Sequence, residues 1–226
     1  MKYTPNLLLL AIALLLPIIS VSAQTLAVTE YGDTIFVYDN GTWSYDMLDE
    51  MPEQETVFDY LNQELDIVEI EAPFTTPAKA QKVLTAPNDM FDVKYDASVW
   101  KRVPPATLNE DATFAIQGKE RDIWCVVIAE ETEISKDKLL LIAKNTLDES
   151  SGKKSEILSV EARNVNGTDL LRGVLKADLN GLVIVFDSYY YSNDAGSVQF
   201  VTWTTETVWK RNQEMIHDLL NGFVVK

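Results

Sequence analysis

Few side chains in this sequence could carry chemistry. His217 is the only histidine and Cys125 the only cysteine among the 226 residues. A single histidine cannot build a multi-histidine metal site, and the sequence shows no catalytic triad around it. His217 lies between Ile216 and Asp218 in a helix-like segment. We therefore expect it to have a structural role at the surface or half-buried.

Paired carboxyl groups and glycine loops are the other routes to catalysis. Acid-base hydrolysis needs two carboxyl groups at the right separation. Such pairs arise by chance in any acidic chain, and four residues could form them here across strands: Asp178, Asp187, Glu130 and Glu131. None of the 9 glycines falls in a nucleotide-binding pattern, and no acidic loop fits a calcium template. We therefore predict a protein that is not an enzyme and binds no cofactor or metal.

Aromatic residues are the most suggestive binding feature. The run Tyr189 to Tyr191 lies near a predicted turn, and Trp203 is on the following strand-like segment. Rings with polar tips suit sugars, peptides or apolar small molecules, so we predict contacts to a ligand or partner at Tyr189, Tyr191 and Trp203. Tyrosine is also a favoured strand residue, and a role in the core or at a sheet edge is the alternative.

Cys125 lies in the apolar segment "DIWCVVIAE". No lysine, arginine or histidine adjoins it to lower its pKa, so we predict a buried, unreactive thiol. A single cysteine also excludes a disulfide within the chain.

The first 23 residues have the composition of a signal peptide. Lys2 precedes the apolar run Leu7 to Ile19, and Val21-Ser22-Ala23 has the small residues of a cleavage site. The apolar run is too short for a typical membrane span, so we predict cleavage before Gln24 and no transmembrane span, with an uncleaved anchor as the alternative. The mature protein would then reach the periplasm or the extracellular space.

Negative charge is concentrated in the first part of the mature chain. Between Gln24 and Ala78 there are 13 acidic and no basic residues. Repulsion from phosphate groups makes nucleic acid a poor partner and also disfavours anionic lipid surfaces. We expect a solvated linker, with a metal site or a basic partner as the alternatives.

Residues 24–45 predict an N-terminal β-hairpin. Apolar and polar residues alternate around Asn40-Gly41, which suits a type I′ turn. An isolated hairpin is only marginally stable, so we expect Trp43 and Tyr45 to contact a partner, unless the hairpin docks on its own domain. Residues 46–87, acidic and then proline-containing, are predicted to be a linker to a domain over 88–226. We expect the hairpin to be a detachable interaction module.

Four strand-like runs dominate the main domain. They cover 156–165, 168–179, 182–192 and 197–205, and Asn166-Gly167 and Asn180-Gly181 separate the first three. Two-residue Asn-Gly connections join only antiparallel neighbours, so these runs predict a β-meander. Further strands are expected upstream at 90–96, 112–118 and 122–131.

Two amphipathic segments bracket the meander. Residues 135–150 begin at a potential N-cap serine, and residues 206–223 carry an apolar stripe that ends at Asn221-Gly222. In the run 182–192 both alternating sets of side chains are apolar, which indicates cover on each face of the sheet. The fold class is therefore α+β, with helices on both faces of the sheet.

This order of elements resembles the PsbP-like fold. The resemblance rests on "FDVKYDASVWKRV", with Trp100 shortly after a strand, followed by strands, a helix, a meander and a C-terminal helix. It implies an α/β/α sandwich over about Phe91 to Val225 and a binding or assembly role without catalysis. Separately, "EYGDTIFVYDNGTWSY" looks like a segment found just after the leader of many exported bacterial proteins.

These observations predict a non-enzymatic, exported envelope protein that binds a protein partner or assists assembly. The alternative is a carrier of a small hydrophobic or sugar ligand, with an aromatic pocket at the end of the meander.

Overall fold

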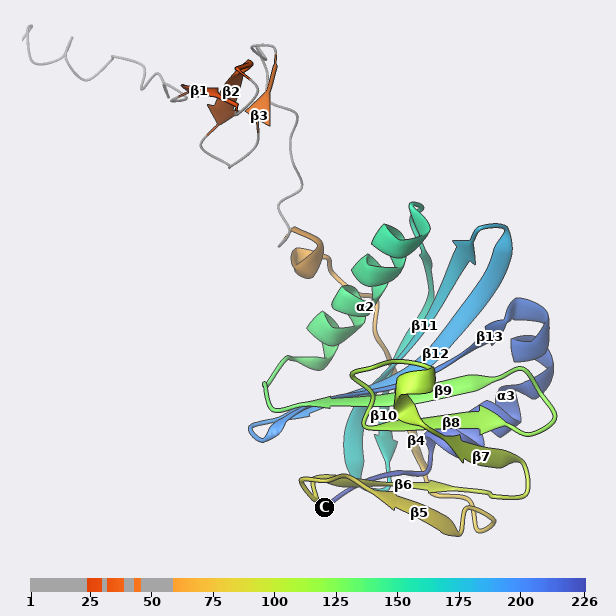
Figure 1. Ribbon diagram of the computed structural model, residues 1–226. Helices are drawn as coiled ribbons and strands as arrows, with labels where there is room; N and C mark the ends of the chain where they lie inside the picture. The colour runs from red at the N-terminus through yellow and green to blue at the C-terminus, as the bar shows by residue number, and fades with distance from the viewer. Residues whose placement is uncertain (1–23, 30–31, 39–42, 46–58) are drawn as a thin grey trace, which may run out of the picture. The chain divides into compact units, whose positions relative to one another are not determined.

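The computed structural model describes residues 24–29, 32–38, 43–45 and 59–226 (Figure 1). The chain divides into two compact units, 1–54 and 55–226, which are described separately. The predicted signal peptide and residues 46–58 of the predicted linker lie outside the described residues.

The described residues of the N-terminal unit form three strands. β1 (Gln24–Val28) pairs antiparallel with β2 (Thr34–Tyr38), and β2 pairs antiparallel with β3 (Trp43–Ser44). The unit is therefore a three-stranded sheet, larger than the predicted hairpin, because residues 24–28 also pair. The predicted Asn40-Gly41 turn lies outside the described residues.

The predicted meander is confirmed. β10 (Glu156–Val165), β11 (Thr168–Leu179), β12 (Leu182–Asn193) and β13 (Gly196–Thr205) pair antiparallel in chain order (Figure 1). Asn166 and Gly167 have φ of 52° and 86°, and Asn180 and Gly181 have φ of 56° and 89°. Two successive positive φ angles are what a type I′ turn requires, so the Asn-Gly pairs set these connections.

The meander belongs to an eight-stranded sheet with the order β4-β10-β11-β12-β13-β9-β8-β7. β7 (Trp100–Val103), β8 (Phe114–Gly118) and β9 (Trp124–Glu130) extend it beyond β13. A smaller sheet joins β14 (Phe223–Val225), β6 (Phe91–Tyr95) and β5 (Lys82–Thr85). The strands predicted at 90–96, 112–118 and 122–131 are thus β6, β8 and β9.

Part of the predicted linker is structured. β4 (Val68–Phe74) pairs in parallel with β10, and β5 also lies within 46–87. Ile70 and Phe74 are partly buried while Glu69 and Glu71 are exposed. Apolar and acidic residues alternate at the start of this segment, as is typical of a half-buried strand, but the sequence prediction considered only its acidic composition. The predicted linker is therefore wrong for residues 68–74 and 82–85.

Two α-helices and two short 3-10 helices complete the described residues. α2 (Lys136–Ser151) has Ser135 at its N-cap position and Gly152, with φ of 64°, after its last residue. α3 (Glu206–Leu220) departs from helical geometry at Asn212. The 3-10 helices are η1 (Asp59–Asn62) and η2 (Pro105–Thr107). Both predicted helices are thus present.

Buried side chains of the sheet fall into two clusters. Tyr189 and Tyr191 pack in a cluster with Leu219 of α3, whereas Tyr190 packs in a second cluster with Leu140 of α2. Successive strand residues point to opposite faces, so the three tyrosines serve two different layers. α2 contacts β11 and β12, and α3 contacts β12 and β13 (Figure 1).

None of the helices among the described residues is both long and apolar enough to span a membrane.

Candidate functional site

An apolar cleft lies between α2 and the strands β9, β12 and β13. Its volume is about 350 Å³. Apolar side chains form most of its lining: Leu108, Val126, Ile128, Ile142, Ala143, Leu147, Leu175, Phe186, Tyr190, Val201 and Trp203. The polar lining residues are Asn109, Thr146, Ser188 and Gln199, so no charged group lines the cleft.

The position of α2 explains why this part of the sheet is open. At Gly173 of β11 the helix lies so close that a Cβ atom would be 2.3 Å from Cδ1 of Leu140. α2 therefore packs tightly on β11 and β12. Val201 on β13 and Ile128 on β9 continue the apolar face beyond the helix and are only partly buried. The cleft therefore lies where α2 leaves this face of the sheet uncovered.

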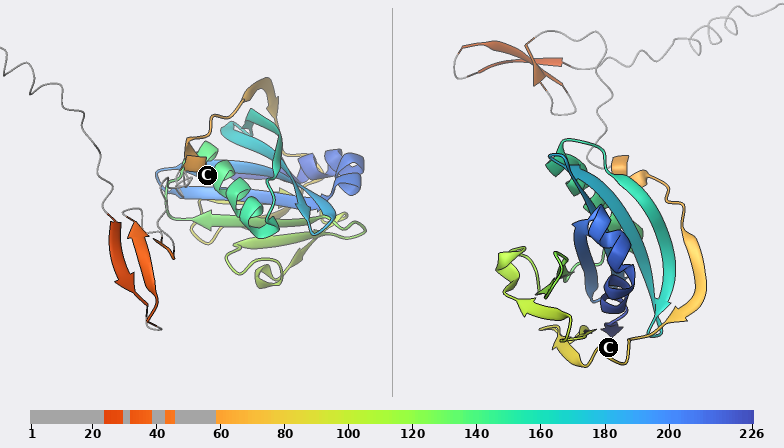
Figure 2. Two further views of the ribbon diagram at one scale, coloured as in Figure 1. Left: turned by 90° about the horizontal axis from the view of Figure 1, so that it is seen from above. Right: turned by 90° about the vertical axis from the view of Figure 1, so that its right-hand side faces the viewer.

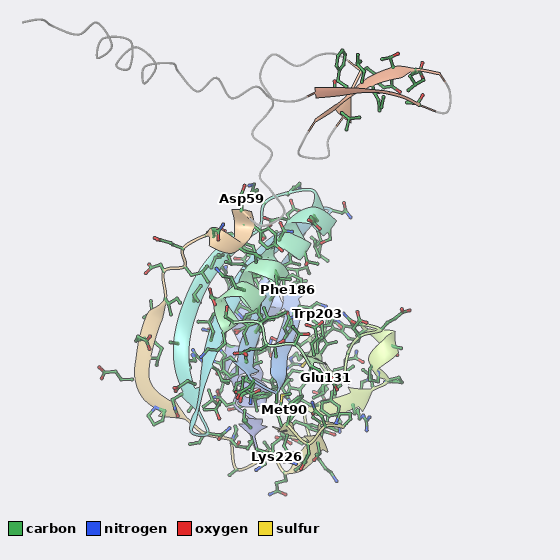
Figure 3. The ribbon with its side chains drawn as sticks, turned by 90° about the vertical axis from the view of Figure 1, so that its left-hand side faces the viewer. Asp59, Met90, Glu131, Phe186, Trp203 and Lys226 are labelled. Atoms are coloured by element: carbon green, nitrogen blue, oxygen red, sulfur yellow. The ribbon has the colours of Figure 1, made fainter. Side chains whose placement is uncertain are left out.

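Aromatic rings line one wall of the cleft. Phe186 and Trp203 are direct partners across the β12 and β13 pair, and both are partly exposed (Figure 3). Tyr190 is buried in the same lining, and burial raises the pKa of its hydroxyl further above neutral pH. Such a wall can hold apolar or aromatic groups and offer a few neutral hydrogen-bonding partners.

The structure separates the predicted site residues. Trp203 lines the cleft, but Tyr189 and Tyr191 are on the other face of β12 and are only 1% and 9% exposed. Their rings belong to the core under α3, where Tyr191 lies 5.9 Å from the ring of Phe223. They are therefore core residues, the alternative that strand propensity favoured. Alternation along β12 could have shown that Tyr190, and not its two neighbours, shares a face with Phe186.

The two predicted contacts in the N-terminal unit are described only in part. Trp43 is in β3, opposite Val37. Tyr45 is 59% exposed. Their role as partner contacts stays a prediction.

A buried charged network occupies the opposite face of the sheet. Asp187 of β12 is fully buried, and Arg172 of β11 donates two hydrogen bonds to it, at 2.8 and 2.7 Å. Trp209 of α3 donates to the same carboxylate at 3.1 Å, and His217 Nε2 lies 3.5 Å from it. Burial alone would raise the pKa of Asp187, but hydrogen bonds from His217 and Arg172 and the charge of Arg172 hold it well below its usual value.

The network continues across β10 to α3. Glu161 accepts hydrogen bonds from Arg172 at 2.8 Å and from Arg163 at 2.6 Å. Arg163 also donates to the hydroxyl of Tyr189 at 3.1 Å, and that hydroxyl donates to Asn221 at 2.7 Å. The two arginines are thus matched by two carboxylates, and the hydrogen bonds of Trp209 and Asn221 connect the network to α3 and its C-terminal end.

Two of the four carboxyl groups considered for acid-base chemistry, Asp187 and Asp178, have separate basic partners. Asp187 is bound by Arg172, whereas Asp178 is paired with Lys153 at 2.6 Å on the surface. Cys125 is fully buried, and desolvation raises the pKa of its thiol, so the predicted core role is confirmed. His217 is partly exposed, in agreement with the predicted half-buried position. The described residues contain no group of three or more metal-ligating side chains.

Comparisons with known proteins bear on the fold. No protein-family model and no curated protein sequence matches this chain. Among solved structures, the chain is similar to cyanobacterial PsbP (CyanoP) from Synechocystis, with a TM-score of 0.53 and 15% identity, over 70% of this chain and 99% of that one. The chain has the PsbP-like fold. The sequence resemblance is thereby confirmed for the PsbP-like domain, as a mixed α+β fold with a large sheet and two helices.

Two other structures resemble this PsbP-like domain more distantly. The Ran-binding protein Mog1p from Saccharomyces cerevisiae has a TM-score of 0.46 and 10% identity, over 64% of this chain and 94% of that one. LpqN, described as involved in cell envelope biogenesis of Mycobacterium tuberculosis, has a TM-score of 0.43 and 11% identity, over 64% and 90%.

Proposed function

We propose that this chain is an exported, non-enzymatic envelope protein that binds a protein partner or assists assembly through the cleft beside α2. The leader-like residues 1–23 support export to the periplasm or beyond. The PsbP-like fold supports a binding role, because the resemblance to that fold implies binding or assembly without catalysis.

The observation that carries this proposal is the apolar lining of an open cleft. Partly exposed apolar side chains next to one another commonly mark interaction sites on soluble domains. Here Trp203 and Phe186 offer aromatic surface beside the aliphatic Val201. A partner that inserted apolar side chains between these residues and α2 would remove them from water, at about 25 cal/mol per Å² of apolar surface buried.

The two faces of the sheet have different roles in this proposal. We infer that α2 and α3 form a helical layer on each face, as in an α/β/α sandwich. The α3 face is filled by large side chains and by the charged network, whereas α2 leaves part of its face open. The binding surface is therefore on the α2 face. Residues 46–58 would link this domain to the N-terminal unit, whose Trp43 and Tyr45 would contribute a second contact.

A small-ligand carrier is the second candidate function. The cleft volume of about 350 Å³ is within the range of small-molecule sites, about 300–1,000 Å³. Its neutral lining, with four polar side chains among apolar ones, fits an uncharged hydrophobic ligand. Sugars bind by stacking on aromatic faces, and Trp203 could provide one.

A matched pair of valine substitutions tests the proposal. Val201→Lys places a charge in the cleft, whereas Val183→Lys places the same charge on β12 away from it. Tagged full-length chains are recovered from intact envelope, and bound proteins and small molecules are quantified by mass spectrometry. We expect Val201→Lys alone to lose a bound protein. Loss of a small molecule but not of a protein from Val201→Lys would favour the carrier. Equal recovery of bound molecules by the wild type, Val201→Lys and Val183→Lys would contradict both functions.

A further inference from the structure

β4 forms one edge of the eight-stranded sheet. It pairs with β10 on one side, from Val68 opposite Glu161 to Phe74 opposite Val165. On its other side no strand lies beside it among the described residues. Figures 2 and 3 show β4 along the outer margin of the domain. An edge strand of this kind presents backbone N–H and C=O groups that a further strand can pair with.

Apolar side chains are exposed next to this edge. Ile67, Val68 and Leu158 are 40%, 54% and 37% exposed. Two hollows adjoin the same residues: one of about 330 Å³ contains Val68 and Leu158, and one of about 420 Å³ contains Ile67. Side chains of an added strand would therefore find apolar surface beside the backbone that they approach.

Unpaired carboxylates follow the same edge. They belong to Glu64, Asp66, Glu69 and Glu71, all exposed. Within the part of the chain that the structure describes, none of the four has a hydrogen-bond or ion-pair partner. Two of them line the smaller hollow and Glu69 lines the larger. The edge therefore combines pairing groups, partly apolar hollows and carboxylates without a basic partner, since Lys136 in the larger hollow donates to the carbonyl of Asp169.

Charge at a sheet edge also has a protective role, because it prevents accidental pairing with other chains. Protection alone does not require apolar residues to be exposed there, and Val68 is among the most exposed apolar residues of the domain. A basic strand would satisfy both features, since lysine or arginine side chains would meet the carboxylates while alternate apolar side chains entered the hollows.

We propose that the β4 edge binds an extended, basic segment of a partner protein, which pairs with β4 as a further strand of the sheet. Backbone hydrogen bonds would provide affinity, and the carboxylates would select basic partners and speed association. This site shares no lining residue with the cleft beside α2, so it stands independently of the function proposed above.

The probe for this site is a synthetic peptide of about eight residues that alternates lysine and valine, a common strand length. One comparison peptide replaces lysine with glutamate, and another replaces valine with proline, which cannot donate a backbone hydrogen bond. Binding to the full-length chain is measured by fluorescence anisotropy, and hydrogen exchange reports which backbone amides become protected.

We expect the lysine-valine peptide alone to bind and to slow amide exchange in β4. Glu69→Lys/Glu71→Lys should weaken binding at least about tenfold, the effect of about 1.4 kcal/mol. Glu110→Lys/Glu120→Lys makes the same change in net charge at exposed residues outside the edge and should weaken binding much less. Circular dichroism verifies that both variants fold.

Three results would overturn the proposal: binding of the glutamate peptide with equal affinity, equal weakening by both double variants, or unchanged exchange of the β4 amides in the wild-type chain. Self-association of Glu69→Gln/Glu71→Gln with undiminished peptide binding would show that the carboxylates only protect the edge.

Discussion

The guanidinium of Arg172 on β11 binds the carboxylate of Asp187 on β12 through both of its oxygens, at 2.8 and 2.7 Å. The two side chains are 6% and 1% exposed. The low dielectric around a buried bidentate pair strengthens the attraction between the two charges. It also makes either charge costly to bury without its partner. The pair therefore joins two central strands at the place where Trp209 of α3 contacts the sheet.

Removal of one member of this pair should destabilise the fold. Asp187→Asn keeps the shape of the side chain but leaves the charge of Arg172 incompletely compensated, so we expect a loss of about 3–5 kcal/mol in the free energy of unfolding, measured by urea titration. Asp178→Asn is the control, because its pair with Lys153 is on the surface and should contribute at most about 1 kcal/mol. Equal losses in the two variants would contradict the structural role of the network.

The same pair predicts a dependence of stability on pH. The pKa of Asp187 is lower in the folded chain than in the unfolded chain, where it is near the usual value of about 3.9. Below that value the unfolded chain binds the proton first, so this contribution is fully present above about pH 4 and is lost as the pH falls toward the folded pKa. The stability difference between wild type and Asp187→Asn should therefore shrink as the pH falls from about 4 to about 2. A stability difference that stays constant over this pH range would contradict a lowered pKa of Asp187 in the folded chain.

Gly173 controls the approach of α2 to the sheet. A Cβ atom there would be 2.3 Å from Cδ1 of Leu140 and 3.1 Å from Cε2 of Tyr190. Gly173→Ala should therefore cost about 1–3 kcal/mol by overpacking. In a Leu140→Ala background the nearest obstructing atoms are absent and only Cε2 of Tyr190 stays close, so the same substitution should cost less. Urea titrations of the wild type, the two single variants and the double variant give the coupling energy. A coupling near zero would show that Leu140 of α2 does not contact β11 at Gly173.

The N-terminal unit should be removable without much loss of stability in the main domain, provided that the deletion ends before β4. Deletion of 24–54 leaves β4 intact and should change Tm by no more than about 2–4 °C. Deletion of 24–71 also removes Leu65, which packs against the cluster under α2, and the pairing of Val68 and Ile70 with β10. This longer deletion should lower Tm by clearly more. A fall in Tm clearly above about 4 °C after the shorter deletion would show that the N-terminal unit is part of the core.

Local sequence signals predicted the meander well, because each Asn-Gly pair specifies a two-residue antiparallel connection by itself. Both helices were also predictable from their apolar periodicity. β4 was missed because its acidic residues dominated the composition, although Val68 and Ile70 alternate with Glu69 and Glu71. Its parallel pairing with β10, about 90 residues away in sequence, has no local signal.

The candidate site was predicted only in part. Trp203 lines the cleft, but the choice between Tyr190 and its neighbours depends on which face of β12 each helix covers, and composition does not contain that information. The network was missed because its members come from four elements. The only local indication was a charged residue inside each of two apolar strands, Arg172 in β11 and Asp187 in β12.

Site-specific photo-cross-linking tests the central claim most directly. A photoreactive amino acid is placed at Gln199, which lines the cleft, or at Gln213, an exposed residue of α3, in the full-length chain in intact cells. The account predicts a discrete protein adduct from position 199 that Val201→Lys abolishes, and none from position 213. Adducts of equal yield from both positions, or an adduct at 199 that Val201→Lys leaves unchanged, would contradict a binding function for the cleft.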